Sequence, residues 1–146
     1  MVTAPTVPLE ELCDRLELVD HDVLRQGVRH VRRLVEGGPP DLEATFARLR
    51  ETLEAQLADE AMHVLPACRR LDEHGNCDEA LLASMPGLED DHLETLTLLE
   101  RLEELATGEA AAAVAALSRD VREHIRLEHE VLFPRVLDIC GGRASV

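Results

Sequence analysis

Four long segments of the sequence carry apolar residues at helical spacing, and only short breaks separate them. The segments cover residues 9–35, 41–71, 86–106 and 109–138. In each one the apolar side chains recur every three or four residues, which places them along one face of a helix. The Gly-Gly-Pro-Pro break at 37–40 is typical of a helix end. Because short connections force consecutive helices to run antiparallel, the pattern predicts an all-α, up-down-up-down four-helix bundle.

Three prolines limit these helices further. A proline inside a helix removes one backbone hydrogen bond and crowds the preceding turn. Pro66 is therefore expected to kink the second helix or end its regular part, and Pro86 to separate a short helical stretch at 78–83 from the third helix. Pro134 lies late in the fourth helix, and the Gly-Gly pair at 141–142 is expected to close the fold.

Length and composition favour a single helical domain. The chain has 146 residues, of which 45% are hydrophobic and 1% aromatic. A scarcity of aromatic residues is unfavourable for a β-sandwich or barrel, whereas abundant Leu, Ala and Glu favour helix. We expect one domain over 1–146 with its core at 8–138, a break at 74–76 between its halves, and tails at 1–7 and 141–146.

The charge balance excludes some partners. The chain has 30 acidic and 15 basic residues, for a net charge of −15. No nucleic acid is expected as a partner, because phosphates bind to basic surfaces, and no anionic membrane is expected for the same reason. No apolar run reaches the ~18–20 residues of a spanning helix, and the N-terminus lacks the regions of a signal peptide. We expect a cytoplasmic protein, as a monomer or a weak homodimer.

The cysteines predict reduced thiols. Cys13, Cys68, Cys77 and Cys140 are widely spaced and form no Cys-x-x-Cys motif. In a chain of this size without a signal peptide, such cysteines are more often free than part of a disulfide framework. Cys68, His74 and Cys77 lie close in sequence, but their spacing matches no zinc motif.

The fourth segment carries two polar residues on its apolar face. Leu117, Val121, His124, Glu128 and Leu132 follow one another in steps of four, three, four and four. This spacing places all five in one buried helical stripe. A histidine and a glutamate buried there need a partner, since an unpaired buried charge is very costly. A metal ion would satisfy both side chains.

The two halves of the sequence resemble each other around such polar positions. The Asp-His pair at 20–21 matches the Asp-His pair at 91–92, and the stretch 56–66 matches the stretch 124–134. In both of these stretches a glutamate lies six residues before a proline. The repeat predicts two helical hairpins related by a pseudo-twofold axis.

The repeat also brings together polar residues at stripe positions that Leu, Val or Ala otherwise fill. Each helix contributes at least one of them at a similar depth, so their nitrogen and oxygen atoms would converge in the core. Two carboxylates can bridge two metals while imidazoles complete each site, and this set suits iron and would also accept manganese or zinc. The candidate metal ligands are His21, Gln56, Glu60, His92, His124 and Glu128.

These motifs resemble a known family. The His124-x-x-x-Glu128 motif, the Val-Leu-Phe-Pro that follows it and the paired His21 and His92 are similar to the hemerythrin-like domain, also called the HHE cation-binding domain. The resemblance extends over roughly residues 10–138 and is most specific in the fourth helix. It implies a non-haem di-iron centre, bridged by an oxo group or a carboxylate, that meets dioxygen, peroxide or nitric oxide, or reports on iron.

Two positions depart from the family pattern. Gln56 stands where the second helix usually has the histidine of His-x-x-x-Glu, and His129 stands where a second glutamate usually follows Glu128. The first departure leaves three arrangements open. In the first, which is the preferred interpretation, Gln56 coordinates weakly or hydrogen-bonds a metal-bound water. In the second, His63 replaces Gln56, because it lies at a same-face spacing from Glu60. In the third, one metal position is weak, which gives a mononuclear or asymmetric site. The histidines without a match in the other half are expected at the surface or in loops: His30, His74 and His129.

The predicted function follows from this site. We expect a protein that binds or senses dioxygen, nitric oxide, peroxide or the iron and redox state, with a small diatomic molecule or peroxide as its ligand. One alternative is a peroxide-decomposing or nitric-oxide-handling di-iron enzyme in oxidative stress defence, and another is a bundle with a structural zinc and no redox role. The chain has no Tyr or Trp, which excludes a tyrosyl-radical mechanism. Whether the protein is an enzyme stays open.

Overall fold

The computed structural model describes residues 7–74 and 77–144, and this part of the chain is helical without a strand. None of its helices is both long and apolar enough to cross a membrane. Four arms make up the fold. The first contains α1 (Leu9–Asp14), the π-helix η1 (Arg15–Asp20) and α2 (His21–Val35); the second contains α3 (Pro40–Asp59), the π-helix η2 (Glu60–Val64) and α4 (Leu65–His74); the third is α5 (Glu79–Leu105); the fourth contains α6 (Gly108–Leu127), the π-helix η3 (Glu128–Leu132) and α7 (Phe133–Ala144).

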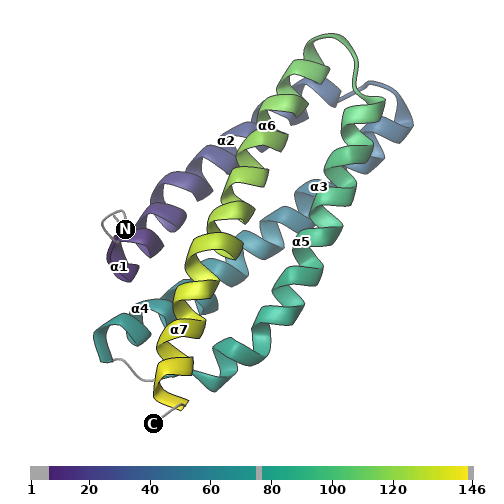
Figure 1. Cartoon of the computed structure of the whole chain (residues 1–146). Coiled ribbons are helices and arrows are strands. Elements are labelled where there is room, and N and C mark those ends of the chain that lie inside the picture. The colour runs from purple at the N-terminus through teal and green to yellow at the C-terminus, as the bar shows by residue number, and fades with distance from the viewer. Residues whose placement is uncertain (1–6, 75–76, 145–146) are drawn as a thin grey trace, which may run out of the picture.

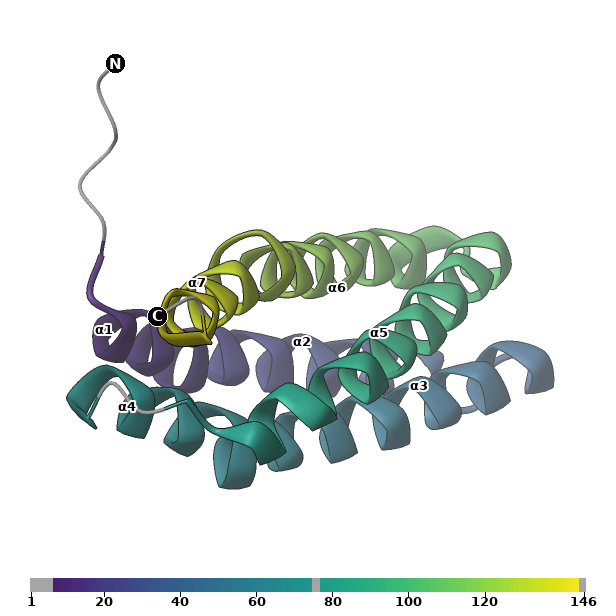
Figure 2. The same ribbon diagram turned by 60° about the horizontal axis from the view of Figure 1, so that its bottom comes forward.

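The arms run alternately up and down, which confirms the predicted four-helix bundle (Figure 1). The two hairpins pack face to face, with α2 against α6 and α3 against α5 (Figure 2). Gly27 permits the close approach of α2 to α6, because a Cβ atom there would lie 3.0 Å from Leu117 Cδ1. The pairing therefore joins each arm of the first hairpin to an arm of the second.

Two predicted helix boundaries are wrong. Pro86 lies inside α5, which continues from Glu79 without a separate short helix. Asp78 fixes the start of α5, since its side chain accepts a hydrogen bond from the Leu81 N–H at 3.0 Å. Pro86 is exposed, so water can solvate the carbonyl that loses its donor. The fourth arm continues past Asp138 and the Gly-Gly pair at 141–142 to Ala144. Of the predicted break at 74–76, His74 ends α4 and residues 75–76 lie outside the described part of the chain.

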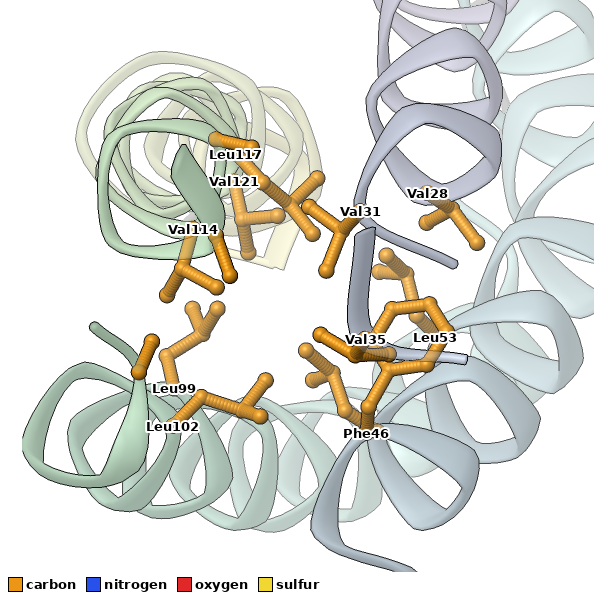
Figure 3. Close-up of a cluster of buried hydrophobic side chains, with 14 of the residues drawn as sticks. Val28, Val31, Val35, Phe46, Leu53, Leu99, Leu102, Val114, Leu117 and Val121 are labelled. Carbon is orange, nitrogen blue, oxygen red and sulfur yellow. The ribbon is translucent and has the colours of Figure 1, made fainter. Parts of the chain in front are cut away.

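Two hydrophobic clusters fill the bundle and leave a polar layer between them. The upper cluster contains side chains from α2, α3, α5 and α6, among them Val31, Phe46 and Leu99 (Figure 3). The lower cluster contains side chains from α1, η1, η2, α4, the beginning of α5, η3 and α7, among them Leu16 and Leu132. Burial of this apolar surface stabilises the bundle on both sides of the polar layer.

The π-helices interrupt three of the four arms beside this layer. In η2 and η3 the closing hydrogen bonds span five residues, from the Leu65 N–H to the Glu60 carbonyl and from the Phe133 N–H to the Glu128 carbonyl. A proline follows each of them, and because a proline has no N–H, the α-helical hydrogen-bond series is already broken there. Pro66 therefore changes the local winding and does not end its arm. Single π turns of this kind frequently occur at functional sites.

The prediction that all four cysteines are reduced is wrong for two of them. Cys77, which precedes α5, and Cys140, in α7, form a disulfide, with their Cα atoms 4.9 Å apart. Cys13 and Cys68 are buried thiols of α1 and α4 that contact each other. The hydrogen bond with Cys13 and the burial raise the pKa of the Cys68 thiol, so it stays protonated.

Candidate metal centre

The polar layer consists of side chains that are almost inaccessible to solvent. All four arms contribute to it, and the most exposed member has 6% of its surface accessible. Burial of so many ionisable groups is unfavourable unless they are paired or bind a cation. The members of the layer are His21, Gln56, Glu60, His92, Thr95, His124 and Glu128.

One group of three potential ligands combines both hairpins. The Nε2 atoms of His21 and His124 lie 3.0 Å and 3.1 Å from the same oxygen, Oε2 of Glu60. One ligand atom from each residue lies within 4.8 Å of the others. Two imidazoles and a carboxylate around one point form a ligand set used for iron and zinc. We name this point position 1.

A second group shares Glu60 with the first. Nε2 of His92 lies 3.7 Å from Oε1 of Glu60 and 3.3 Å from Oε2 of Glu128, and these three residues again offer ligand atoms within 4.8 Å of one another. We name this point position 2. Because the two oxygens of Glu60 face different positions, its carboxylate is placed to bridge two cations.

Glu128, like Glu60, contacts a histidine of each position. Its Oε1 lies 2.7 Å from Nε2 of His124, and its Oε2 accepts no hydrogen bond within the described residues although it is buried. His21 Nδ1 is likewise buried without a partner there. A carboxylate oxygen that is buried, unsatisfied and surrounded by imidazole nitrogens fits a cation, so the residues present are suited to the ion that the layer implies.

The pKa values of these groups depend on one another. Burial would raise the pKa of Glu60, but its hydrogen bonds with His124 and His21 hold it well below the ordinary value. Burial and the charge of Glu60 raise the pKa of Glu128 well above its ordinary value. Burial would lower the pKa of His124, but hydrogen bonds with Asp20, Glu128 and Glu60 raise it. A cation that binds to these groups would therefore displace protons from them.

Outer partners orient the two central histidines. Nδ1 of His124 lies 3.4 Å from a carboxylate oxygen of Asp20. Nδ1 of His92 lies 2.7 Å from Nε2 of His129, a half-buried residue of η3. In both histidines Nε2 therefore faces the candidate cation positions, as expected when the other ring nitrogen is held by a hydrogen bond. Burial, followed by the charge of His92, lowers the pKa of His129.

Gln56 is held by hydrogen bonds at the edge of the layer. Its side-chain nitrogen donates to the Asp91 carbonyl at 2.8 Å and to the Thr95 hydroxyl at 2.7 Å, and this hydroxyl donates to the same carbonyl at 3.1 Å. Because a carbonyl only accepts, the amide nitrogen must face α5. The side-chain oxygen is then the only atom of Gln56 with a lone pair to offer a cation.

The predicted ligand candidates reach the layer with one exception. His21, Gln56, Glu60, His92, His124 and Glu128 are all buried in it, whereas His63 is exposed and lines a groove on the outside of η2. Since η2 contains more residues per turn than an α-helix, the residue inside the bundle after Glu60 is Val64. The arrangement in which His63 replaces Gln56 is therefore wrong.

Sequence reasoning missed two contributors. Asp20 contacts His124, and His129 contacts His92. Asp20 and its repeat partner Asp91 precede the matched histidines, which was a usable signal for Asp20. His129 has Ala61 as its counterpart in the other half, so the repeat gave no signal for it.

A small surface pocket reaches the layer at position 1. Its volume is about 80 Å³, and it lies between the first and fourth arms. The buried His124 is part of its wall together with Asp20, and Arg15, Asp120 and Glu123 lie around it. Solvent or a small ligand in this pocket is thus separated from position 1 by the imidazole of His124.

The fold and this layer define an antiparallel helical bundle with a buried candidate cation centre. Residues 14–136 match the model of the family described as hemerythrin HHE cation binding domain. Because the match covers most of the chain, the protein belongs to this family, and the resemblance inferred from its motifs is confirmed. No curated protein matches the chain.

Proposed function

We propose that the protein is a non-haem iron protein with a di-iron centre in the polar layer, and that it binds or senses a small ligand such as dioxygen, nitric oxide or peroxide. The observation that carries the proposal is the pair of three-residue groups that share the Glu60 carboxylate. Membership of a cation-binding family supports the same conclusion.

The residues have distinct roles in this proposal. His21, His124 and Glu60 would hold one iron, and His92, Glu60 and Glu128 would hold the other. A ferrous pair supplies redox chemistry and coordination positions for a small ligand. The apolar clusters above and below the layer exclude bulk water from it.

The ligand set leaves room for a small molecule. At position 2 three protein groups converge among the described residues, and the amide nitrogen of Gln56 faces α5. Iron commonly accepts more ligands than three, so a diatomic molecule or peroxide could occupy a remaining position. This openness supports ligand binding or sensing over a purely structural cation.

The test compares two histidines with opposite environments. His124→Ala should abolish iron binding, whereas the matched His63→Ala, on the exposed face of η2, should retain the iron content of the wild type. Metal analysis and the near-ultraviolet absorption of an oxo-bridged di-ferric centre are the measurements. Unchanged iron in His124→Ala would refute the assignment.

Two further results separate the alternative functions. If the iron-loaded protein releases oxygen from peroxide over many turnovers, the protein is an enzyme and not only a binding or sensing protein. Stoichiometric zinc without iron, in protein produced without added metal, would contradict both redox functions.

A further inference from the structure

The two cation positions differ in their donors. Position 1 combines two imidazoles with a carboxylate, and position 2 combines one imidazole with two carboxylates. The residue that would supply the second imidazole at position 2, by the internal repeat, is Gln56. Its amide nitrogen is committed to Thr95 and to the Asp91 carbonyl. Both positions therefore have three donors, but position 2 has one imidazole fewer and one carboxylate more than position 1.

The outer partners of the two positions differ as well. Behind His124, at position 1, stands the carboxylate of Asp20. Behind His92, at position 2, stands the imidazole of His129. A carboxylate partner makes an imidazole a stronger electron donor to a cation, whereas another imidazole orients the ring without adding a negative charge.

His129 has a geometric role in this arrangement. If Nε2 of His92 is to face position 2 with its lone pair, Nδ1 must carry the proton and donate it to Nε2 of His129, which lies 2.7 Å away. The centroid of the His129 ring also lies 5.4 Å from that of the Phe133 ring, so the two rings are in contact. Loss of the acceptor would leave the His92 ring free to choose the other tautomer.

We infer that the two positions fill in order: position 1 binds its cation tightly, position 2 binds a second cation more weakly and exchangeably, and His129 is the positioning residue that prepares His92 for this second cation. This inference rests on the proposed function, because it requires that the layer binds two cations. The occupancy of position 2 would then change with the concentration of available cation.

The experiment is an anaerobic titration of the metal-free protein with Fe²⁺. Binding is measured by calorimetry and, separately, by competition with a chelator. Two binding steps are expected, with dissociation constants that differ by at least about tenfold, the lower limit for one lost outer partner. Binding of no Fe²⁺ would refute the proposed function itself. Two steps of equal affinity, or a single step of one cation, would overturn the ordered filling and leave cation binding by the layer intact.

Variants of the two outer partners assign the steps. His129→Phe keeps a ring beside Phe133 but removes the acceptor, and should weaken the second step about tenfold or more while the first changes less than about threefold. His129→Gln offers an oxygen acceptor to His92 and should restore much of the second step. The matched variant Asp20→Asn should weaken the first step. Equal effects of His129→Phe on both steps, or no rescue by His129→Gln in a protein with wild-type circular dichroism, would overturn the role of His129.

Discussion

Glu60 is the residue on which both cation positions depend, so Glu60→Gln is the most informative substitution. The side chain is 2% exposed, and its two oxygens face different positions. Glutamine has the same shape but is neutral, and its terminal nitrogen has no lone pair to offer. We therefore expect the variant to fold and to lose high-affinity cation binding at both positions.

The magnitude follows from the linkage between binding and folding. A cation at 100 times its dissociation constant stabilises the folded state by about 2.7 kcal/mol for one position. For a chain of about 150 residues this corresponds to a rise in Tm of roughly 5–11 °C. Wild-type protein should show at least this rise in a thermal melt with and without added Fe²⁺, and Glu60→Gln should show almost none. A variant with the full rise would refute the view that Glu60 bridges the positions.

Three other perturbations test separate parts of the account. Cys140→Ser removes a disulfide that closes a loop between residues 63 apart, and should lower the free energy of unfolding by about 2–4 kcal/mol in a denaturant titration; an unchanged midpoint would show that the bond does not contribute to stability. Asp78→Ala removes the hydrogen bond to the Leu81 N–H and should cost about 1 kcal/mol in the same assay, and a loss below about 0.3 kcal/mol would contradict its role as the cap of α5. Because the pKa of His124 is raised above its ordinary value, a cation must displace its proton, and cation affinity should increase by up to about tenfold per pH unit until the pH exceeds that raised pKa. In the absence of a cation the folding stability changes in the opposite direction, because the stability that protonated His124 contributes is complete below pH 6.5 and is lost as the pH rises through the raised pKa. A cation affinity that does not change with pH would contradict the protonation of His124.

The bundle and most of the candidate layer could be predicted because they depend on local periodicity. The stripe through His124, Glu128 and Leu132 is buried as the spacing predicts, and the repeat-matched His21 and His92 both lie beside Glu60. Both arguments use only the direction of side chains on a helix, which the sequence determines well.

The errors arose where the winding or the tertiary contacts departed from a regular helix. An α-helical turn allows His63 to face the same side as Glu60, but in η2 the residue that faces inward is Val64. The contact of His129 with His92 depends on how α5 and η3 pack, which no pattern within either segment reveals. The Cys77–Cys140 bond also joins residues far apart in sequence, and pairings of this kind do not follow from spacing.

Whether the buried layer holds two cations can be seen by anomalous X-ray diffraction at the iron absorption edge from crystals of the iron-loaded protein. We expect two anomalous peaks inside the bundle, one among His21, His124 and Glu60 and a weaker one among His92, Glu60 and Glu128. Anomalous density only at the protein surface, or none within the layer, would contradict this expectation.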